Sequence, residues 1–415
     1  MQIIDDSILE TYQKWSKKLD RNDLRIFVLI RIEDFAKPQI EKYLKATTAE
    51  DHVRARFYVS DLAAHFGWKL EACQRMLNAL IESGMCVLEQ TSTGIAFKMT
   101  EHRRETYAQT ELIQWLNSEI ESDSSLGAII SYVDQIISFA GSLSLLYKSE
   151  PNLFSEASNL MTLTFYRHVV CRAMTNDCIL LGLERGGSVA DVAFELSSSR
   201  LFDHYDKPDD LMALHALTFA FSNWQSSLDL ADYLEKIGST KFLDIGGGIG
   251  QVMLACKSIF LRPAEFTVMD HPSTQFSLQK LRTTVCGADD LIIRRFYHDF
   301  TVQHEKASSS TQMEGFDCLI LGWILHDWDD LTSHFILRNA LAYLEPGGKI
   351  IVLERPLEDD RIKNAGYDFN MLLQAGGKER TLSEYDDLLK SHNLKRIDLI
   401  AKEVGRHFLV YERGC

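Results

Sequence analysis

The spacing of hydrophobic residues changes near Phe242. Before that point, apolar residues recur every third or fourth position, as in Ile129, Val133, Ile136 and Ile137, which is the spacing of amphipathic helices. After it, short apolar runs alternate with helical stretches. The pattern therefore predicts a mainly helical N-terminal half followed by an α/β region.

Short apolar runs in the second half predict strands separated by helices. This alternation favours an α/β fold with a mostly parallel sheet covered by helices on both faces, ending in an antiparallel pair. Ligands of such sheets bind at the carboxyl ends of the strands. The predicted strands are 242–245, 265–270, 291–296, 316–321, 349–353, 394–401 and 406–411.

The pattern is helical to about residue 50 and then typical of a winged helix over residues 57–99. Ser60 is the expected N-cap of a first helix that Gly67 ends, and Thr93-Gly94 is the expected wing between two strands. The second helix would bury Cys73, Met76, Leu77, Leu80 and Ile81.

The exposed face of that second helix would decide whether the unit binds DNA. We expect Lys69, Gln74, Arg75 and Asn78 on this face, offset by the acidic side chains of Glu71 and Glu82. Because DNA binding depends on a basic surface, this composition favours a dimerisation platform instead.

Residues 105–235 read as consecutive helices, with breaks predicted near 122–125, 150–152 and 186–187. Residues 126–147 are long enough to span a bilayer and carry one charge, Asp134, but serines and glutamine interrupt them too often. We expect a buried or interface helix there. Residues 202–210 lead into a helix over 211–223, placed to help close a cleft.

Composition adds limits to this picture. A chain of 415 residues, 46% apolar and 25% charged, is long enough for several domains, and we divide it into 1–110, 111–235 and 236–415. The net charge of −15 disfavours a nucleic-acid partner. Eight scattered cysteines without a C-x-x-C pair, and no secretory leader, predict a reducing, cytoplasmic setting.

The first strand of the α/β region runs into a D-x-G-G-G-x-G turn, Asp244 to Gly250, followed by a helix. Such a turn brings backbone N–H groups close to a ligand. Gln251 or Met253 occupies the place of the third glycine of a dinucleotide fingerprint, and no P-loop follows. The turn therefore suits a ligand with an adenosine and an amino acid but no phosphate, such as S-adenosylmethionine (SAM).

Carboxylates follow the next two strands. Asp270 stands 20 residues beyond Gly250, where an acid can accept both hydroxyls of a ribose or, alternatively, cap a helix. Asp299, within Tyr297 to Phe300, could bind the amino group of an adenine or lie in a solvated turn.

The fourth strand ends in His326 beside Asp327, with Trp323 and Trp328 as apolar walls. This pattern predicts a titratable base in an apolar slot. Two carboxylates can reach the same edge of the sheet and orient the imidazole. They are Glu354, otherwise a strand-end salt bridge, and Glu379, otherwise a helix cap.

Taken in order, these motifs resemble the plant-type O-methyltransferase family, which includes caffeic acid and flavonoid enzymes and their fungal and bacterial relatives. The resemblance runs from about residue 55 to the C-terminus. It is carried by Leu243-Asp244-Ile245-Gly246-Gly247-Gly248-Ile249-Gly250, Asp270-His271-Pro272, His326-Asp327-Trp328-Asp329-Asp330, Pro346-Gly347-Gly348-Lys349 and Gly376-Gly377-Lys378-Glu379-Arg380-Thr381. Gly322 departs from the family, where a lysine is common.

The resemblance implies a Rossmann-like class I methyltransferase sheet behind an N-terminal winged-helix dimerisation domain, and a homodimer that uses SAM in secondary metabolism. It implies His326 as the base, with Glu354 and Glu379 flanking it. The SAM site it implies consists of Asp244, Gly246, Gly248, Asp270, Asp299, Phe300 and Trp323.

The function expected from these observations is methyl transfer to a hydroxyl of a small aromatic or polyketide-like metabolite, with no membrane or nucleic-acid partner. One alternative is methylation of carbon or nitrogen, or a non-methylating reaction in the same pocket. A second is a SAM-sensing winged-helix regulator. A third is a metal held by His271, His298 and His326.

Overall fold

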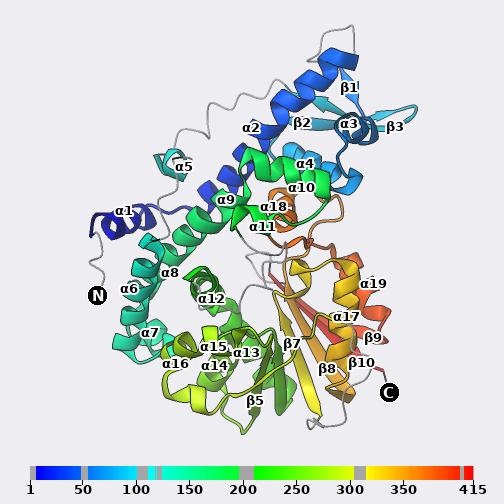
Figure 1. Cartoon of the computed structure of the whole chain (residues 1–415). Coiled ribbons are helices and arrows are strands. Elements are labelled where there is room, and N and C mark those ends of the chain that lie inside the picture. Colours follow the sequence, from blue (N-terminus) through cyan, green and yellow to red (C-terminus); the bar gives the residue numbers. More distant parts are fainter. Residues whose placement is uncertain are drawn as a thin grey trace.

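The computed structural model describes residues 6–47, 55–100, 111–116, 118, 124–195, 210–302, 315–401 and 406–414. The predicted segment 202–209 and the loop 304–314 lie outside these residues. A helical part, drawn at the top and left of Figure 1, adjoins a part built around a β-sheet.

The sheet has seven strands in the order β6-β5-β4-β7-β8-β10-β9. The first five are parallel, and β10 is antiparallel to both β8 and β9, as predicted. The strand order reverses at β4, which lies between β5 and β7. The bounds are β4 Lys241–Ile245, β5 Glu265–Asp270, β6 Arg294–Tyr297, β7 Phe316–Gly322, β8 Leu344–Glu354, β9 Leu394–Ala401 and β10 His407–Arg413.

Two predicted strand starts differ from the structure by more than one residue. The strand expected from residue 291 begins at Arg294, because Gly287–Leu291 form a 3₁₀ turn with φ of +58° at Gly287. The strand expected from residue 349 begins at Leu344, since the register between β7 and β8 shifts and absorbs the Pro-Gly-Gly segment as a bulge.

Alternate residues of the strands enter different cores. On one face, Phe242, Ile320 and Ile351 pack with α13 (Trp224–Ile237) and α14 (Gln251–Ile259). On the other, Leu243, Leu319 and Ile350 pack with α17 (Asp330–Leu341) and α19 (Leu382–Lys390). This two-residue period and the helices on both sides (Figure 1) confirm the predicted α/β sheet.

The N-terminal elements are α1 (Asp6–Ser16), α2 (Arg21–Thr47), α3 (Val59–Phe66), α4 (Leu70–Glu82), and the strands β1 (Arg56–Phe57), β2 (Cys86–Thr91) and β3 (Gly94–Met99). The strands form a small sheet in the order β1-β3-β2. Gly67 ends α3 with φ of +73°, as predicted. Ser60 is not the N-cap, because α3 begins one residue before it, after the extended backbone of Tyr58.

The polar face expected on α4 is exposed only in part, since Lys69 and Glu71 are exposed but Arg75 and Asn78 are buried. Arg75 and Asn78 retain only 5% and 8% of their accessible surface, because this face packs against α18 (Ala365–Ala375). Figure 1 shows α18 between α4 and the sheet. The side chains that would have faced DNA instead join the N-terminal region to the rest of the molecule.

The middle of the chain is helical, and the predicted breaks at 150–152 and 186–187 are present. Residues 126–147 form two helices rather than one, since Gly141 has φ of +89° and the hydroxyl of Ser142 caps the second. The helices are α5 Glu111–Leu116, α6 Ser124–Ala140, α7 Leu143–Ser149, α8 Pro151–Phe165, the π-helix Tyr166–Val170, α9 Cys171–Ala173, α10 Asn176–Arg185, α11 Ala190–Ala193 and α12 Asp210–Ser222.

Within the described residues, no single helix is long and apolar enough to cross a membrane. Only the pair Leu126–Ala140 and Leu143–Ser149 would pass such a test together, by length and composition, and it is bent by 72°. Their side chains Ile129, Val133 and Ile137 are fully buried.

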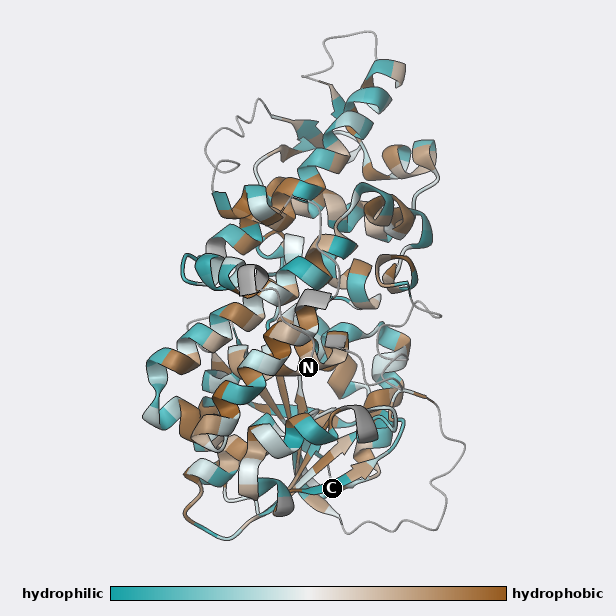
Figure 2. Ribbon diagram, turned by 60° about the vertical axis from the view of Figure 1, so that its left-hand side comes forward, coloured by the Kyte–Doolittle hydropathy of each residue, from teal (hydrophilic) through white to brown (hydrophobic). Residues whose placement is uncertain are grey.

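One cluster of buried apolar side chains runs from α1 and α2 through the middle helices to one face of the sheet. Figure 2 shows these inner ribbons as largely hydrophobic. The seven described cysteines are free and buried, which agrees with a packing role. The helical half and the sheet therefore share one core.

Glu82, at the end of α4, caps the N-terminus of α18. Its carboxylate accepts hydrogen bonds from the backbone N–H groups of Asn364 (2.9 Å) and Gly366 (2.8 Å), and Arg25 pairs with it at 2.7 Å. A carboxylate at a helix N-terminus satisfies donors that the helix leaves free. This cap comes from a segment 282 residues away in sequence.

We predict that Glu82→Ala lowers the free energy of unfolding by about 1–2 kcal/mol, since both backbone donors lose their acceptor. Arg25→Met should cost less than about 1 kcal/mol, because the Arg25 side chain is 39% exposed and the cap survives. Urea denaturation of the two variants measures both. Equal losses would show that the ion pair, not the cap, stabilises this contact.

Candidate active site

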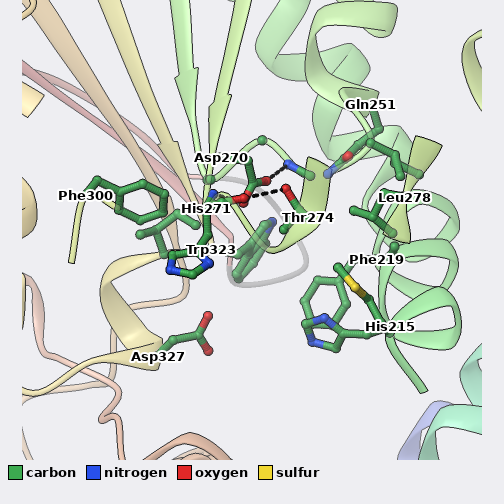
Figure 3. A pocket seen from close by; sticks show the side chains of 18 of the residues that line it. His215, Phe219, Gln251, Asp270, His271, Thr274, Leu278, Phe300, Trp323 and Asp327 are labelled. Atoms are coloured by element: carbon green, nitrogen blue, oxygen red, sulfur yellow. Dashed lines mark hydrogen bonds between the residues drawn. The ribbon is translucent and has the colours of Figure 1, made fainter. Parts of the chain in front are cut away.

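A cleft opens at the carboxyl ends of β4, β5 and β7, where the strand order reverses. Ligands of open α/β sheets bind at this position. The cleft has about 990 Å³ of empty space, part of it open to solvent, and apolar side chains dominate its walls. Figure 3 shows Asp270, His271 and Trp323 on one side of it and α12 on the other.

The glycine turn after β4 forms one wall through Gly246, Gly247 and Gly248. Gly248 has φ of +55°, and a Cβ there would meet no atom within 4 Å, so its missing side chain leaves space in the cleft. The backbone of this turn can therefore approach a ligand closely. Gly246 and Gly248 occupy the places that the sequence predicted.

Asp270, at the end of β5, lines the cleft beside this turn. Its Oδ2 accepts from the N–H of Gly248 at 2.6 Å, and its Oδ1 accepts from the N–H of His271 at 2.7 Å. Burial raises the pKa of this carboxyl, while the two backbone donors oppose the shift. Asp270 thus ties the glycine turn to the next strand and also faces the cleft.

Asp244 does not line the cleft. It is buried beneath the turn, and its Oδ2 has no hydrogen-bond partner among the described residues. Burial and the neighbouring Asp270 raise the pKa of Asp244 to about 8. The structure therefore places a carboxyl that favours its neutral form under the turn, not a ligand contact.

Asp299 also lies outside the residues that line the cleft, although its neighbours Phe300 and Thr301 line it. Asp299 accepts from Thr301 and lies 3.6 Å from Nε2 of His271. The interaction with His271 holds the pKa of Asp299 well below its usual range. Asp299 therefore contacts Thr301 and His271, which line the cleft, and does not line it itself.

Trp323, directly after β7, forms the floor of the cleft in a left-handed conformation, with φ of +61°. Such a conformation is unfavourable for a bulky residue and persists where surrounding contacts fix it. The N–H of Trp323 donates to the carbonyl of Leu353, and the guanidinium of Arg406 lies 5.3 Å from its ring. Its indole Nε1 is buried and has no partner among the described residues.

His326 lies in a 3₁₀ turn over Leu325–Asp327 and is not among the residues that line the cleft. Its ring is 5.8 Å from that of Trp323, which does line it. Its Nδ1 forms a 3.1 Å hydrogen bond with Glu379, and Nδ1 lies 3.8 Å from Glu354. Asp327 approaches Nε2 at 3.5 Å. The structure therefore brings together the three residues that the sequence predicted as a catalytic group.

Glu354 and Glu379 make different contacts in this group. Glu354 is fully buried at the end of β8, and its Oε1 accepts from the backbone N–H groups of Leu325 (3.0 Å) and His326 (3.3 Å). It fixes the turn that carries His326. Glu379 makes the hydrogen bond to the ring and so determines how the ring is oriented.

Burial and the neighbouring carboxylates shift the pKa of His326 in opposite directions. Burial alone lowers the pKa of His326, but the carboxylates of Glu354, Asp327 and Glu379 outweigh it and raise the pKa to about 10. Burial raises the pKa of Glu354 to about 7 and of Asp327 to about 6. The imidazole is consequently a stronger base than a free histidine.

The end of the cleft facing α12 is lined by residues that the sequence did not identify. Met212, His215, Ala216 and Phe219 project from one face of α12, and Figure 3 shows His215 and Phe219 across the cleft from Asp327. Burial and the nearby His326 lower the pKa of His215 to about 4, so it is neutral. Their three-and-four spacing places them on one face of a helix, but it does not show that this face lines the cleft.

The structure does not assemble the predicted metal alternative of His271, His298 and His326. Within the described part of the chain, one group of histidine and acidic ligand atoms lies within 4.8 Å of one another, namely His326, Glu354 and Glu379. Because Glu354 binds two backbone N–H groups and Glu379 binds the ring, we interpret this group as an oriented base.

The chain resembles known proteins in sequence and in fold. Residues 222–394 match the O-methyltransferase domain family. Acetylserotonin O-methyltransferase of Gallus gallus is 28% identical over 222 residues, 52% of this chain and 60% of the relative. The 2,7-dihydroxy-5-methyl-1-naphthoate 7-O-methyltransferase of Streptomyces carzinostaticus is 29% identical over 148 residues, 35% of this chain and 40% of the relative.

The fold as a whole is also shared. The crystal structure of human N-acetylserotonin methyltransferase in complex with SAM matches with a TM-score of 0.51 at 18% identity, covering 94% of this chain and 95% of that one. The fold is thus that of a class I methyltransferase, as predicted. The sequence matches extend over 60% or less of the length of these curated relatives.

We predict that Asp244→Asn becomes progressively more stable than the wild type as pH rises from 4 to 8. A carboxyl with a raised folded-state pKa loses stability over the interval between its unfolded pKa, about 3.9, and its folded pKa. Asparagine mimics the neutral acid, so the gain at pH 8 should be roughly 1–3 kcal/mol. Urea denaturation across this pH range gives the difference, and a constant difference would contradict a neutral Asp244.

Proposed function

Because residues 222–394 form an O-methyltransferase domain, we propose that this protein transfers the methyl group of SAM to a hydroxyl of a small aromatic molecule. The observation that carries the proposal is the imidazole of His326, which Glu379 holds beside Trp323 and Asp327, two residues that line the same cleft as the glycine turn. A methyl donor in the cleft and a base close to it are what such a transfer requires.

The donor end of the cleft fits SAM in two respects. The open space at Gly248 admits a ligand against the backbone, and the carboxylate of Asp270 beside it can accept from ribose hydroxyls. Gly246, Phe300 and Trp323 complete this end. SAM, when bound, supplies an electrophilic methyl group on a positively charged sulfur.

The acceptor end suits a flat apolar molecule. The rings of Phe219, Trp323 and Trp328 and the side chains of Met212 and Ile324 line it. The relatives named above methylate an acetylserotonin and a dihydroxynaphthoate, according to their names, which supports an aromatic acceptor. Asp327 and His215 add polar groups that can bind substituents on the ring.

His326 would remove the proton of the acceptor hydroxyl. Phenols have a pKa of about 10, so a base whose pKa is raised toward that value takes the proton with little energetic cost. Glu379 stabilises the imidazolium that forms, and Glu354 keeps the turn in place. His326, Glu354 and Glu379 are buried, which strengthens the interactions between them.

The identity of the product distinguishes the proposed O-methylation from the alternative reactions. Formation of S-adenosylhomocysteine together with an O-methylated product supports the proposal, whereas N- or C-methylation or a reaction that leaves SAM intact would replace it. The regulator hypothesis is not favoured, because Arg75 and Asn78 are buried against α18 and unable to face DNA.

We also propose that the N-terminal region mediates homodimerisation. Val87, Leu88 and Ile95, in the β2–β3 hairpin, are 40–57% exposed despite being apolar. Exposed apolar side chains on one hairpin favour a protein partner.

Asp270→Ala should weaken binding of S-adenosylhomocysteine by about 10-fold or more, because it removes an acceptor in the cleft and releases the glycine turn. Isothermal titration calorimetry measures the affinity. Asp299→Ala is the matched control, since Asp299 does not line the cleft, and its effect should be smaller. A larger effect at Asp299 would assign the main cofactor contact to that residue.

His326→Ala should lower kcat by about 10²–10⁴-fold while leaving the affinity for S-adenosylhomocysteine unchanged. His334→Ala, on α17, is a control for loss of a histidine and should retain the wild-type rate.

The dependence of kcat on pH provides a further check. The wild-type rate should rise with pH, as the imidazolium loses its proton, with a midpoint above the ordinary histidine value of about 6.5. Glu379→Gln should move this midpoint to lower pH, because a carboxylate that stabilises the imidazolium is gone. An unchanged midpoint would exclude His326 as the titrating group.

A further inference from the structure

We propose that Arg75 of the N-terminal region is a positioning residue, which holds Glu379 and thereby the imidazole of His326 in the catalytic arrangement. The inference rests on the proposed function, in which His326 is the base. It assigns α4, expected from the sequence to serve an interface between subunits, a role inside the active site of its own chain.

The contact between Arg75 and α18 is buried and multiple. Nε of Arg75 lies 2.9 Å from Oδ2 of Asp368, and its Nη2 donates to the backbone carbonyls of Asp368 and Gly377, the latter at 3.0 Å. The two side chains are 5% and 3% exposed. Since water does not screen it, this pair is far more consequential than a surface salt bridge.

Asp368 connects Arg75 to Glu379. While one oxygen of Asp368 pairs with Arg75, the other, Oδ1, accepts from the backbone N–H of Glu379 at 2.9 Å. The side chain of Glu379 then bonds the ring of His326 at 3.1 Å. Three consecutive buried contacts thus link Arg75 to the base.

The second contact of Arg75 holds the same loop at Gly377. A Cβ on Gly377 would lie 2.1 Å from the carbonyl oxygen of His326, so this loop packs directly against the backbone of the base. Arg75 donates to the carbonyl of Gly377 from the opposite side. The loop is therefore fixed between α4 and the turn that carries His326.

Loss of Arg75 would disturb this arrangement through Asp368. Burial already raises the pKa of Asp368, and Arg75 is the largest influence that opposes the shift. Without Arg75 the carboxyl favours its neutral form, which is a weaker acceptor for the N–H of Glu379. The Glu379 carboxylate would then be held less firmly at the imidazole.

The charged groups that face His326 come from four elements. They are Glu354 of β8, Asp327 of its own turn, Glu379 of the loop after α18, and His215 of α12. Of these, Glu379 alone is linked to Arg75 through Asp368, whose other charged neighbour is Arg361. A change at Arg75 that alters the charges around His326 consequently acts through Glu379, whereas its contact with Gly377 acts on the backbone of the turn that carries His326.

The test is a titration of His326 by NMR in protein with isotope-labelled histidine, using the loss of one signal in His326→Asn for assignment. In Arg75→Met we expect the pKa of His326 to fall by about 1 unit, since the stabilising carboxylate is displaced. Glu82→Ala, which weakens the neighbouring contact between α4 and α18 but spares Arg75, should leave it unchanged. An unchanged pKa in Arg75→Met would overturn the proposal.

A second variant tests the same link in case Arg75→Met does not fold. Asp368→Asn removes the charge that pairs with Arg75 and weakens the acceptor for Glu379, so it should shift the pKa of His326 in the same direction. If both variants fold and neither shifts it, Arg75 has only a structural role.

Kinetics provide an independent readout. Arg75→Met should lower kcat by about 10-fold or more with little change in KM for SAM, and combining it with Glu379→Gln should add little further loss, because both act on one contact. Additive losses would contradict the proposed link. Absence of methyl transfer by the wild type would refute the proposed function instead, while the titration would still decide the role of Arg75.

Discussion

The edge of the sheet that carries His326 depends on burying an imidazole among three carboxylates. Such a group is unfavourable in a protein interior unless each charge has a partner and the surrounding backbone donors are satisfied. Glu354 uses backbone N–H groups of the same turn for this purpose, and Glu379 uses the ring of His326. Placing these side chains within a few ångströms requires strand ends and loops from separate parts of the sheet.

Arg380 supplies much of the remaining support. Its guanidinium is almost fully buried, and it donates to the carbonyls of Leu325 and Trp328 on either side of the base, and to Asp330. The loop from Gly377 to Arg380 therefore delivers both the carboxylate that orients His326 and the cation that fixes its turn. On the other side, α4 reaches the same loop through Arg75. The N-terminal region and the turn that carries His326 are consequently joined through this loop.

Much of the fold followed from local patterns. The short apolar runs that alternate with helical stretches after Phe242, and the helical spacing before it, predicted an α/β sheet behind a helical region, and the glycine turn marked the position of the cleft. The start of β8 could not be predicted, because Pro346-Gly347-Gly348 is a turn signal that pairing with β7 converts into a bulge. Likewise, Gly141 and Ser142 divide a helix that periodicity alone would continue.

The candidate site was predictable where residues follow strand ends. Glu354 and Asp270 end strands and His326 lies in the turn after β7, and parallel strands bring their carboxyl ends to one edge, so sequence predicted that these residues share that edge. Sequence by itself thus determined the class of fold and the position of the cleft. It could not determine that Asp244 faces inward beneath the turn, that His215 lines the cleft from α12, or that Arg75 is buried against α18. Those placements depend on how helices distant in sequence pack on the sheet, and only the tertiary structure decides which face of a helix is covered.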